Sequence, residues 1–590
     1  MKATVIIIMS KNIENGMISK KKCLWQYLMN ALCPEEKRGT RHLIFVLLSL
    51  ATMVASLGVV IYYICGPMEG YLHADYTDTI YWANASYESG KVLDPDFKYA
   101  GILPFSANLW FIPYIAIFGV SMTAHKLGMI TYLVLQSAAI WFMLRSFKWS
   151  ISSTSLTISA FLLLLSGSEK LREMMWGHVI YYSLAVLLLC VGLGLISRLS
   201  ETNLDAIKNG KTGGAVKYAL LIALAALLFG GNGTNGFQLI VLVTLPCMVC
   251  AVADVFFSRD KKLLDKGNNV PYITVAVIVV STVIGILLLK YWQGDITVNY
   301  TAYYSKINPA DKWVDNFMRI PMHWFTLLGC DLKESKAFLE PESIGTLIFA
   351  FVGLLLAVLP VVGLANIRKI ENKGSRAILW AHLTVSAVVI FGYTCGNLGN
   401  VNWRMLPMFA TAILASAATL KYFADIAPEK SFAPKRIAVV LAALMALGSA
   451  YNFRAMAKMD YDFERDDIYH QLAEELEAMG LEYGYATFWY SQSITLLSDS
   501  KVKTRMILAD PDDGVTTDYY QNNFNWYEDV EGVEKYFVLL TKAENRTVEK
   551  SDKWNDFLAT TKHEKDYLFD NYVLYVFEEN LDFPDPELFK

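Results

Sequence analysis

The sequence predicts a polytopic α-helical membrane protein with about 11 transmembrane helices and a C-terminal α/β domain outside the membrane. Three observations support this fold class. Hydrophobic residues make up 54% of the 590-residue chain, and its mean hydropathy is +0.33. Apolar segments of bilayer-spanning length recur between residues 42 and 454. From residue 455 onward the chain is more polar and shows the periodicities of amphipathic helices and strands.

Each apolar segment is close to the ~20 residues that cross ~30 Å of hydrocarbon. They lie at residues 42–64, 125–144, 150–167, 178–196, 216–231, 236–257, 270–291, 344–366, 377–396, 404–421 and 437–453. Residues 103–119 are also apolar, but Pro104, Asn108 and Pro113 interrupt them. We therefore expect an interfacial or re-entrant segment at this position.

Lysine and arginine predict the orientation. The long predicted outer loop at residues 65–124 holds only Lys91 and Lys98, whereas every predicted inner loop is basic, for example at Arg368 and Lys369. By the positive-inside rule the N-terminus is cytoplasmic and the C-terminus lies outside a plasma membrane. The predicted parts are a basic cytoplasmic leader at residues 1–41, a transmembrane domain at 42–454 with large outer loops at 65–124 and 292–343, and an extracytoplasmic domain at 455–590.

The C-terminal domain combines one clear helix with several short strands. Residues 466–479 place Ile468, Leu472 and Leu476 on one helical face before Gly480 ends the helix. Strands are predicted at residues 485–488, 502–508, 536–540 and 572–577.

Two carboxylates stand where the chain leaves its first span. Asp75 and Asp78 are three residues apart at the start of a predicted helix, so they share one of its faces. Ala83, Ser86 and Gly90 follow at helical spacing and would let this helix lie close to a neighbour. One interpretation is that Asp75 caps the helix and Asp78 sits in its first turn, where the helix dipole favours acids. The other is that they carry out acid–base chemistry or bind a divalent metal ion.

This stretch resembles the GT-C class of integral-membrane glycosyltransferases, the superfamily of protein mannosyltransferases and aminoarabinose transferases. In that class one span is followed by an outer loop that opens with Asp, then a small residue and a Gly. Asp75, Ala83 and Gly90 match that spacing, although Tyr76 stands where many members have Glu. Leu103-Pro104, Pro113 and Phe118-Gly119-Val-Ser121 are similar to the stretch that follows in the family.

The resemblance implies a GT-C-like fold and an inverting sugar transfer from a polyprenyl-phosphate donor to a glycan, lipid or protein hydroxyl on the outer face, as in cell-envelope glycan or glycolipid assembly. It implies that Asp75 is the catalytic residue. Asp78, the second catalytic candidate, could hold a metal ion with Asp75 or orient the acceptor, or could be only a solvated acid in the first turn. Arg404 in Trp-Arg-Met-Leu-Pro is similar to the family's Arg-Tyr-x-x-Pro and is expected to bind the donor phosphate. A snorkelling interfacial arginine is the alternative.

A short polar segment between the third and fourth spans adds further candidates. Lys170, Arg172, Glu173 and His178 could line a donor pocket, with the two cations on the phosphate, or could form a salt-bridged surface. Residues 230–236 are rich in glycine but lack the Lys-Ser/Thr ending of a phosphate loop, so we expect a tight turn there. Aromatic residues in the loop 292–343 could stack on sugars or form an interfacial belt, among them Tyr300, Tyr303, Tyr304, Trp313 and Trp324.

Two other classes of protein remain open at this point. A transporter or flippase of lipid-linked or polar solutes would carry ionisable residues within its spans, and His382 is the main example in this chain. A non-catalytic membrane scaffold with a surface domain would tolerate the loss of Asp75. Neither nucleic-acid binding nor a resident organic cofactor is indicated by the sequence.

Overall fold

The computed structural model describes residues 39–201, 212–257, 269–294, 296, 306–330, 340–426, 433–517, 520–581 and 583. The predicted leader at residues 1–41 lies almost entirely outside this described part, and so do Tyr300, Tyr303 and Tyr304.

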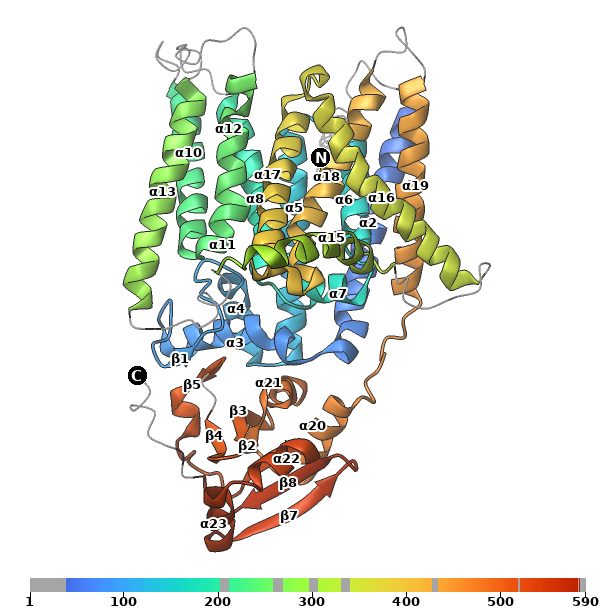
Figure 1. Ribbon diagram of the computed structural model, residues 1–590. Helices are drawn as coiled ribbons and strands as arrows, with labels where there is room; N and C mark the ends of the chain where they lie inside the picture. The colour runs from blue at the N-terminus through green and yellow to red at the C-terminus, as the bar shows by residue number, and fades with distance from the viewer. Residues whose placement is uncertain are drawn as a thin grey trace, which may run out of the picture.

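A bundle of long apolar helices confirms the predicted fold class (Figure 1). Ten helical segments among the described residues are long and apolar enough to cross a membrane. They are α2 (Thr40–Cys65), α5 (Met122–Ser146), α8 (Tyr181–Ser200), α10 (Thr212–Thr234), the continuous α11 (Phe237–Leu239), η4 (Ile240–Thr244) and α12 (Leu245–Phe257), α13 (Asn269–Gln293), α16 (Pro341–Ala365), α17 (Lys373–Cys395), α18 (Leu406–Asp425) with its preceding turn η9 (Asn402–Met405), and α19 (Ala433–Ala457).

The remaining predicted span is shorter than expected. Helix α6 (Ile151–Leu164) has 14 residues, or ~21 Å at ~1.5 Å per residue, which is less than the hydrocarbon thickness. The chain turns after Leu164 and starts α7 (Glu169–Arg172), whose cap is Ser168. The apolar segment at 103–119 contains α4 (Asn108–Phe118), an 11-residue helix too short to span.

The glycine-rich stretch is mostly helical, contrary to the predicted tight turn. Helix α10 continues to Thr234, and only Asn235 and Gly236 form the turn. The reason is close packing of α10 on α13, since a Cβ at Gly233 would lie 2.4 Å from the carbonyl oxygen of Thr282. Small residues let two membrane helices approach to this distance.

Short helices cover the end of the bundle that faces the C-terminal domain. These are η2 (Pro67–Tyr71), α3 (Ala74–Ser89), the π-helical turn η3 (Glu173–Gly177), η6 (Ala310–Lys312), α15 (Trp313–Leu327) and η8 (Asn397–Asn400). Helix α3 runs across the bundle, between the spans and the C-terminal domain (Figure 1). A further short turn, η7 (Ile367–Lys369), follows α16.

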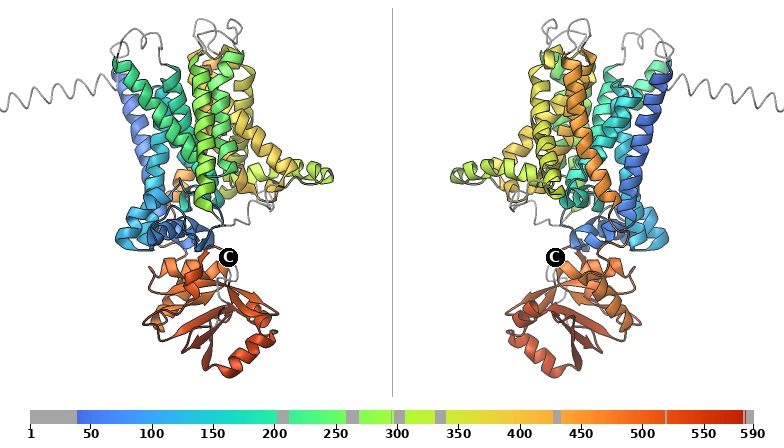
Figure 2. Two further views of the ribbon diagram at one scale, coloured as in Figure 1. Left: turned by 90° about the vertical axis from the view of Figure 1, so that its left-hand side faces the viewer. Right: turned by 90° about the vertical axis from the view of Figure 1, so that its right-hand side faces the viewer.

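The C-terminal domain is an α/β domain built on a mixed six-stranded sheet, below the bundle in both side views (Figure 2). The strand order is β4-β3-β2-β6-β8-β7, with β2 parallel to β3 and β6 and the other pairs antiparallel. The strands are β2 (Tyr483–Ala486), β3 (Lys503–Asp510), β4 (Gly514–Thr517), β6 (Tyr536–Thr541), β7 (His563–Leu568) and β8 (Tyr572–Phe577). The helices are α20 (Ile468–Ala478), α21 (Phe488–Leu497), η10 (Phe524–Tyr527), α22 (Lys542–Val548) and α23 (Asp552–Thr560).

These elements confirm the predicted helix and strands with small shifts. The strand predicted at 485–488 is β2 and ends at Ala486, because α21 begins at Phe488. Strand β7 was not predicted, since His-Glu-Lys-Asp-Tyr-Leu is a mostly exposed edge strand without apolar alternation.

The C-terminal domain is docked on the loops of the bundle. Strand β1 (Phe97–Lys98), from the segment between α2 and α5, pairs antiparallel with β5 (Asn522–Asn523). The N–H of Met122 donates to Asp499 Oδ1 at 2.8 Å, and the hydroxyl of Ser500 donates to the carbonyl of Val120 at 2.6 Å. The end of the bundle and the face of the domain therefore form one surface around α3.

Candidate active site

Helix α3 begins differently from the sequence-based expectation. Its N-cap is His73, whose Nδ1 accepts a hydrogen bond from the N–H of Asp75 at 3.3 Å. The interpretation of Asp75 as the cap is therefore wrong, and Asp75 is the second residue of the helix. Because an imidazole performs the capping, the carboxylate of Asp75 is not used to satisfy the helix backbone.

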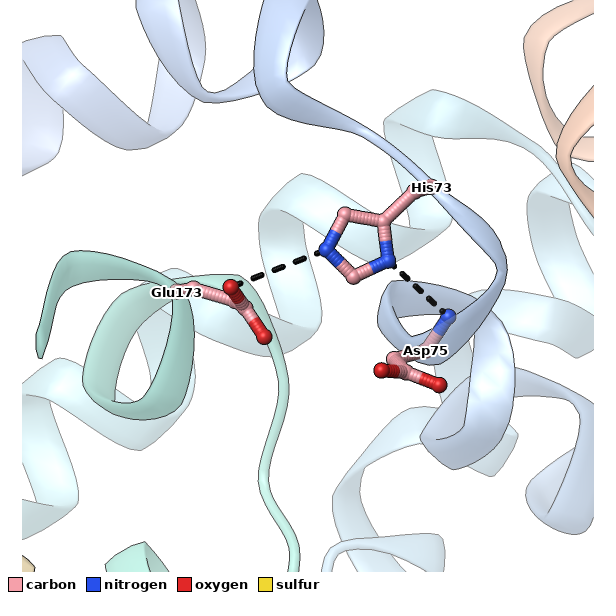
Figure 3. A group of neighbouring side chains, drawn as sticks. All are labelled: His73, Asp75 and Glu173. Carbon is pink, nitrogen blue, oxygen red and sulfur yellow. Dashed lines mark hydrogen bonds and ion pairs between the residues drawn. The ribbon is translucent and has the colours of Figure 1, made fainter. Parts of the chain in front are cut away.

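Three side chains from two segments meet at this helix terminus (Figure 3). Nitrogen and oxygen atoms of His73, Asp75 and Glu173 lie within 4.8 Å of one another. His73 Nε2 is 3.6 Å from Glu173 Oε2, and the other ring nitrogen faces the backbone of Asp75. We call these three residues the acidic triad.

The fold places Glu173 here through the π-helical turn that it begins. Such turns are rare and widen the helix locally, often at functional sites. The carbonyl of Gly177 at its end contacts His125 Nε2 at 2.9 Å. A Cβ on Gly177 would lie 2.3 Å from the ring of Tyr76, so glycine is needed where this turn passes α3.

Glu173 is almost fully buried and surrounded by cationic or imidazole groups. Lys170 forms an ion pair with Oε2, and His178 Nε2 lies 3.8 Å from Oε1. Burial by itself raises the pKa of Glu173, but the contacts with His178, His73 and Lys170 outweigh it and hold the pKa well below its usual range. Glu173 is thus a carboxylate whose charge is already matched.

Asp75 differs from Glu173 in this respect. Across the described residues, the structure shows no hydrogen bond or ion pair to the carboxylate of Asp75, which keeps some solvent exposure. A carboxylate with free lone pairs at the mouth of a membrane bundle can accept a proton from a hydroxyl group.

Asp78 is hydrogen-bonded to the C-terminal domain. Gln521 Nε2 donates to Asp78 Oδ1 at 2.6 Å, while Gln521 Oε1 accepts from Trp82 Nε1 and, at 3.4 Å, from the N–H of Ala100. Desolvation and the nearby charge of Asp75 raise the pKa of Asp78 well above its ordinary value, and the hydrogen bond from Gln521 opposes this only in part. Asp75 and Asp78 thus share a helix face but have different partners.

The three predicted phosphate-binding cations lie in different surroundings. Lys170 reaches over the ring of Trp403, 4.8 Å from its centroid, so it connects the triad to the turn that carries Arg404. Arg404 is buried, and its Nη1 donates to the carbonyl of Asn397 at 2.6 Å. Arg172 is also buried but stacks over Tyr63 and Tyr71 and donates to the carbonyl of Ser166, which is a structural role in the loop.

Sequence reasoning gave no role to His73, Gln521 or Trp489. The ring of Trp489, which is 50% exposed on α21, lies 6.1 Å from the ring of His73. His73 lies two residues before Asp75, at the start of the predicted helix, and this position could have identified it as a possible N-cap. Gln521 and Trp489 carried no local signal, because they reach α3 only through domain docking.

The acidic triad has the nitrogen and oxygen donors that suit a divalent cation. The metal site expected from sequence paired Asp75 with Asp78, whereas the structure groups Asp75 with His73 and Glu173. A cation bound there would replace the present contacts of Glu173 with Lys170 and His73.

No protein-family model and no curated protein matches the chain. Among solved structures, it is similar to ArnT from Cupriavidus metallidurans in the apo state, with a TM-score of 0.47 and 13% identity over 90% of this chain and 97% of that one. It is also similar to the archaeal oligosaccharyltransferase AglB from Archaeoglobus fulgidus, in complex with an inhibitory peptide and a dolichol-phosphate. That TM-score is 0.44 with 11% identity, covering 91% of this chain and 75% of the other.

Both similar structures are of GT-C membrane glycosyltransferases, the class that the sequence resembles. Similarities at these TM-scores and sequence identities assign no role to any residue of this chain. The roles of individual residues rest on the geometry of this chain.

Proposed function

We propose that the protein is an integral-membrane glycosyltransferase that moves a sugar from a polyprenyl-phosphate donor to an acceptor hydroxyl. The observation that carries this proposal is the unengaged carboxylate of Asp75 beside His73 and Glu173, where the bundle meets its polar domain. A lipid-linked donor fits such a site, because its chain can stay in the bilayer while its phosphate and sugar reach the boundary. The positive-inside pattern supports an outer-face location.

The chemical step assigns one role to each group. The acceptor oxygen attacks the anomeric carbon while Asp75 takes the hydroxyl proton, and the bond from the anomeric carbon to the phosphate oxygen breaks. The polyprenyl phosphate leaves with the electron pair of that bond, and attack from the opposite face inverts the anomeric centre. Arg404 and Lys170 supply positive charge for the leaving phosphate. Asp78 supports α3 through Gln521.

The transporter alternative has less support from the bundle. His382, the main ionisable residue predicted within a span, faces Thr411, with its Nδ1 3.0 Å from Oγ1 across α17 and α18. A polar pair between two packed helices is an ordinary way to satisfy a buried imidazole.

The test is sugar transfer by purified protein in liposomes, using a panel of radiolabelled polyprenyl-phosphate sugars and several acceptors. Wild type should transfer label, and Asp75→Asn should lose transfer while it keeps the wild-type thermal midpoint. Asp78→Asn is the matched control, since an amide oxygen can still accept from Gln521. Transport of the intact donor without transfer would support the flippase alternative instead.

The same assay decides whether a cation takes part. If EDTA abolishes transfer and Mn²⁺ or Mg²⁺ restores it, the reaction needs a divalent cation. If Glu173→Gln also raises the cation concentration required for transfer, the acidic triad binds that cation. Transfer that persists in EDTA would show that Asp75 acts without a metal.

A further inference from the structure

Helix α15 lies across the spans rather than along them, at the end of the bundle that carries the site (Figure 1). It contains 15 residues, and its surroundings divide it into three sectors. One sector is buried against the protein, at Asn316, Trp324 and Leu327. The second is polar and exposed, at Asp315 and Arg319.

The third sector is apolar and exposed. Val314, Phe317, Met318 and Met322 have exposed fractions of 69%, 52%, 68% and 53%. Their spacing of three, four and eight residues from Val314 puts them on one side of the helix. Four large apolar side chains on one short helix are more than scattered surface residues, and such a patch marks contact with protein or lipid.

The lipid leaflet is the occupant that the structure favours. The buried sector joins α15 to α16, because Trp324 Nε1 donates to the carbonyl of Gly353 at 3.0 Å. Helix α16 itself exposes Phe351, Leu354 and Val358, the kind of surface that a span presents to hydrocarbon. The Trp324 contact places α15 against this apolar span, and the polar sector of α15 provides the water-facing side of an interfacial helix.

Helix α15 contacts both segments that carry the predicted phosphate-binding cations. On one side, Asn316 Nδ2 donates to the carbonyl of Thr394 at 3.3 Å, and Asn402 Nδ2 donates to Thr326 Oγ1 at 3.4 Å, two residues before Arg404. On the other side, the hydroxyl of Ser168 donates to the carbonyl of Leu327 at 2.7 Å, two residues before Lys170.

The second contact leaves little room for movement. A Cβ on Gly167 would lie 2.9 Å from the carbonyl oxygen of Leu328, and one on Gly329 would lie 2.7 Å from the carbonyl oxygen of Gly167. The C-terminal end of α15 is thus packed backbone to backbone on the loop that begins the Lys170 segment.

We propose that α15 is a membrane-surface helix whose apolar sector lies in the leaflet next to the site, and that it holds the Lys170 and Arg404 segments at the level of the lipid headgroups. The membrane contact is independent of the proposed function. The consequence for the two cations rests on that function, because it assumes that they meet a lipid phosphate.

The first experiment measures the membrane contact without any assay of activity. Single cysteines at Phe317 and Met318, and control cysteines at Asp315 and Arg319, are labelled with a fluorophore in liposomes after the native cysteines have been replaced. We expect spin-labelled lipid to quench the first pair several-fold more than the second, and aqueous iodide to show the reverse. If the protein without its native cysteines does not fold, the same single cysteines are introduced and labelled in the wild-type protein, and the signal of labelled wild type is subtracted.

Two results would overturn the proposal. Equal iodide quenching at all four positions would put the apolar sector in water. Shielding of Phe317 and Met318 from both quenchers would mean that protein, either a partner or a second copy, covers it.

The second experiment tests the consequence for the donor. Phe317→Asp should raise the KM for the lipid-linked donor several-fold and leave the KM for the acceptor unchanged, whereas Phe317→Leu should behave as wild type. If Phe317→Asp leaves the donor KM unchanged while lipid quenching is as expected, the membrane contact of α15 stands. Its proposed effect on Lys170 and Arg404 would then be wrong. Absence of transfer in wild type would count against the proposed function and leave the quenching result standing.

Discussion

Two clusters of charged residues lie at the same boundary between bundle and domain, and they are built in opposite ways. Around Glu69 in η2, every charge is matched: Lys126 from α5 pairs with Oε2, Arg465 Nη2 lies 3.2 Å from the same oxygen, and His470 Nε2 lies 3.7 Å from Oε1. In the acidic triad, Glu173 is matched but the carboxylate of Asp75 has no such partner among the described residues.

This difference indicates that the Glu69 cluster attaches the C-terminal domain to the bundle, whereas Asp75 is available for chemistry. The Glu69 cluster joins the bundle to the segment that leads into α20, so its groups are used for docking. The carboxylate of Glu69 already faces Lys126, Arg465 and His470, so its charge is matched within the protein. Asp75 lies at the start of α3, where His73 caps the helix, so its carboxylate is available to a substrate. Four expected results would break or sharpen this comparison.

The largest effect is expected for Asp75→Asn. Loss of a general base costs typically 10²–10⁴-fold in rate, about 3–5 kcal/mol. The thermal midpoint should not change, because the substitution removes no contact that the folded chain makes. Transfer rates and differential scanning fluorimetry on the same preparation measure both. A lowered midpoint would mean that Asp75 has a structural role.

Glu69→Gln should give the opposite pattern. It leaves Lys126, Arg465 and His470 facing a neutral group, and removing one partner of a largely buried ion pair costs about 3 kcal/mol. We expect a lower thermal midpoint and faster proteolysis between residues 458 and 467, with near-normal transfer at low temperature. Lys553→Ala, which removes an exposed pair with Asp513, is the matched control and should leave the midpoint unchanged.

The stabilising effect of the Glu69 cluster should depend on pH. The acceptors Asp467 and Glu69 outweigh desolvation and raise the pKa of His470 from 6.5 to about 9, so its contribution is complete below pH 6.5 and lost towards pH 9. The contacts of Glu69 with His470 and Lys126 outweigh burial and lower its pKa from 4.5 to about 2, so its contribution is complete above pH 4.5. The midpoint difference between wild type and Glu69→Gln should therefore be greatest between about pH 4.5 and 6.5 and shrink towards pH 9. A constant difference across this range would exclude the His470 contribution.

The smallest effect is expected for Asp78→Asn. The amide can accept the hydrogen bond from Gln521, and it removes the cost of a desolvated charge, so stability should change by less than about 1 kcal/mol. Gln521→Glu should be worse than Asp78→Asn, because it places a second carboxylate against Asp78 and takes away the donor. If Asp78→Asn instead matches Asp75→Asn in lost transfer, the two acids act together and the contrast between them fails.

Much of the architecture follows from the sequence alone, because it depends on local composition. Bilayer-spanning length and apolar periodicity are properties of short windows, and they located the long spans, α20 and most strands of the C-terminal sheet. The same local reasoning singled out Asp75 and Glu173. It failed where packing overrides composition, as at the glycines of α10, which extend a helix against α13 instead of forming a turn.

Only the tertiary structure decided which of these residues meet. His73 and Glu173 are 100 positions apart in sequence and come together because the π-helical turn passes the start of α3. The family resemblance favoured Asp75 over Asp78, but the sequence did not show that domain docking brings Gln521 to Asp78 and leaves the carboxylate of Asp75 without such a partner among the described residues. Hydrogen bonds and ion pairs act over a few ångströms, so the contacts that distinguish two acids on one helix depend on distant segments that no short window of sequence contains.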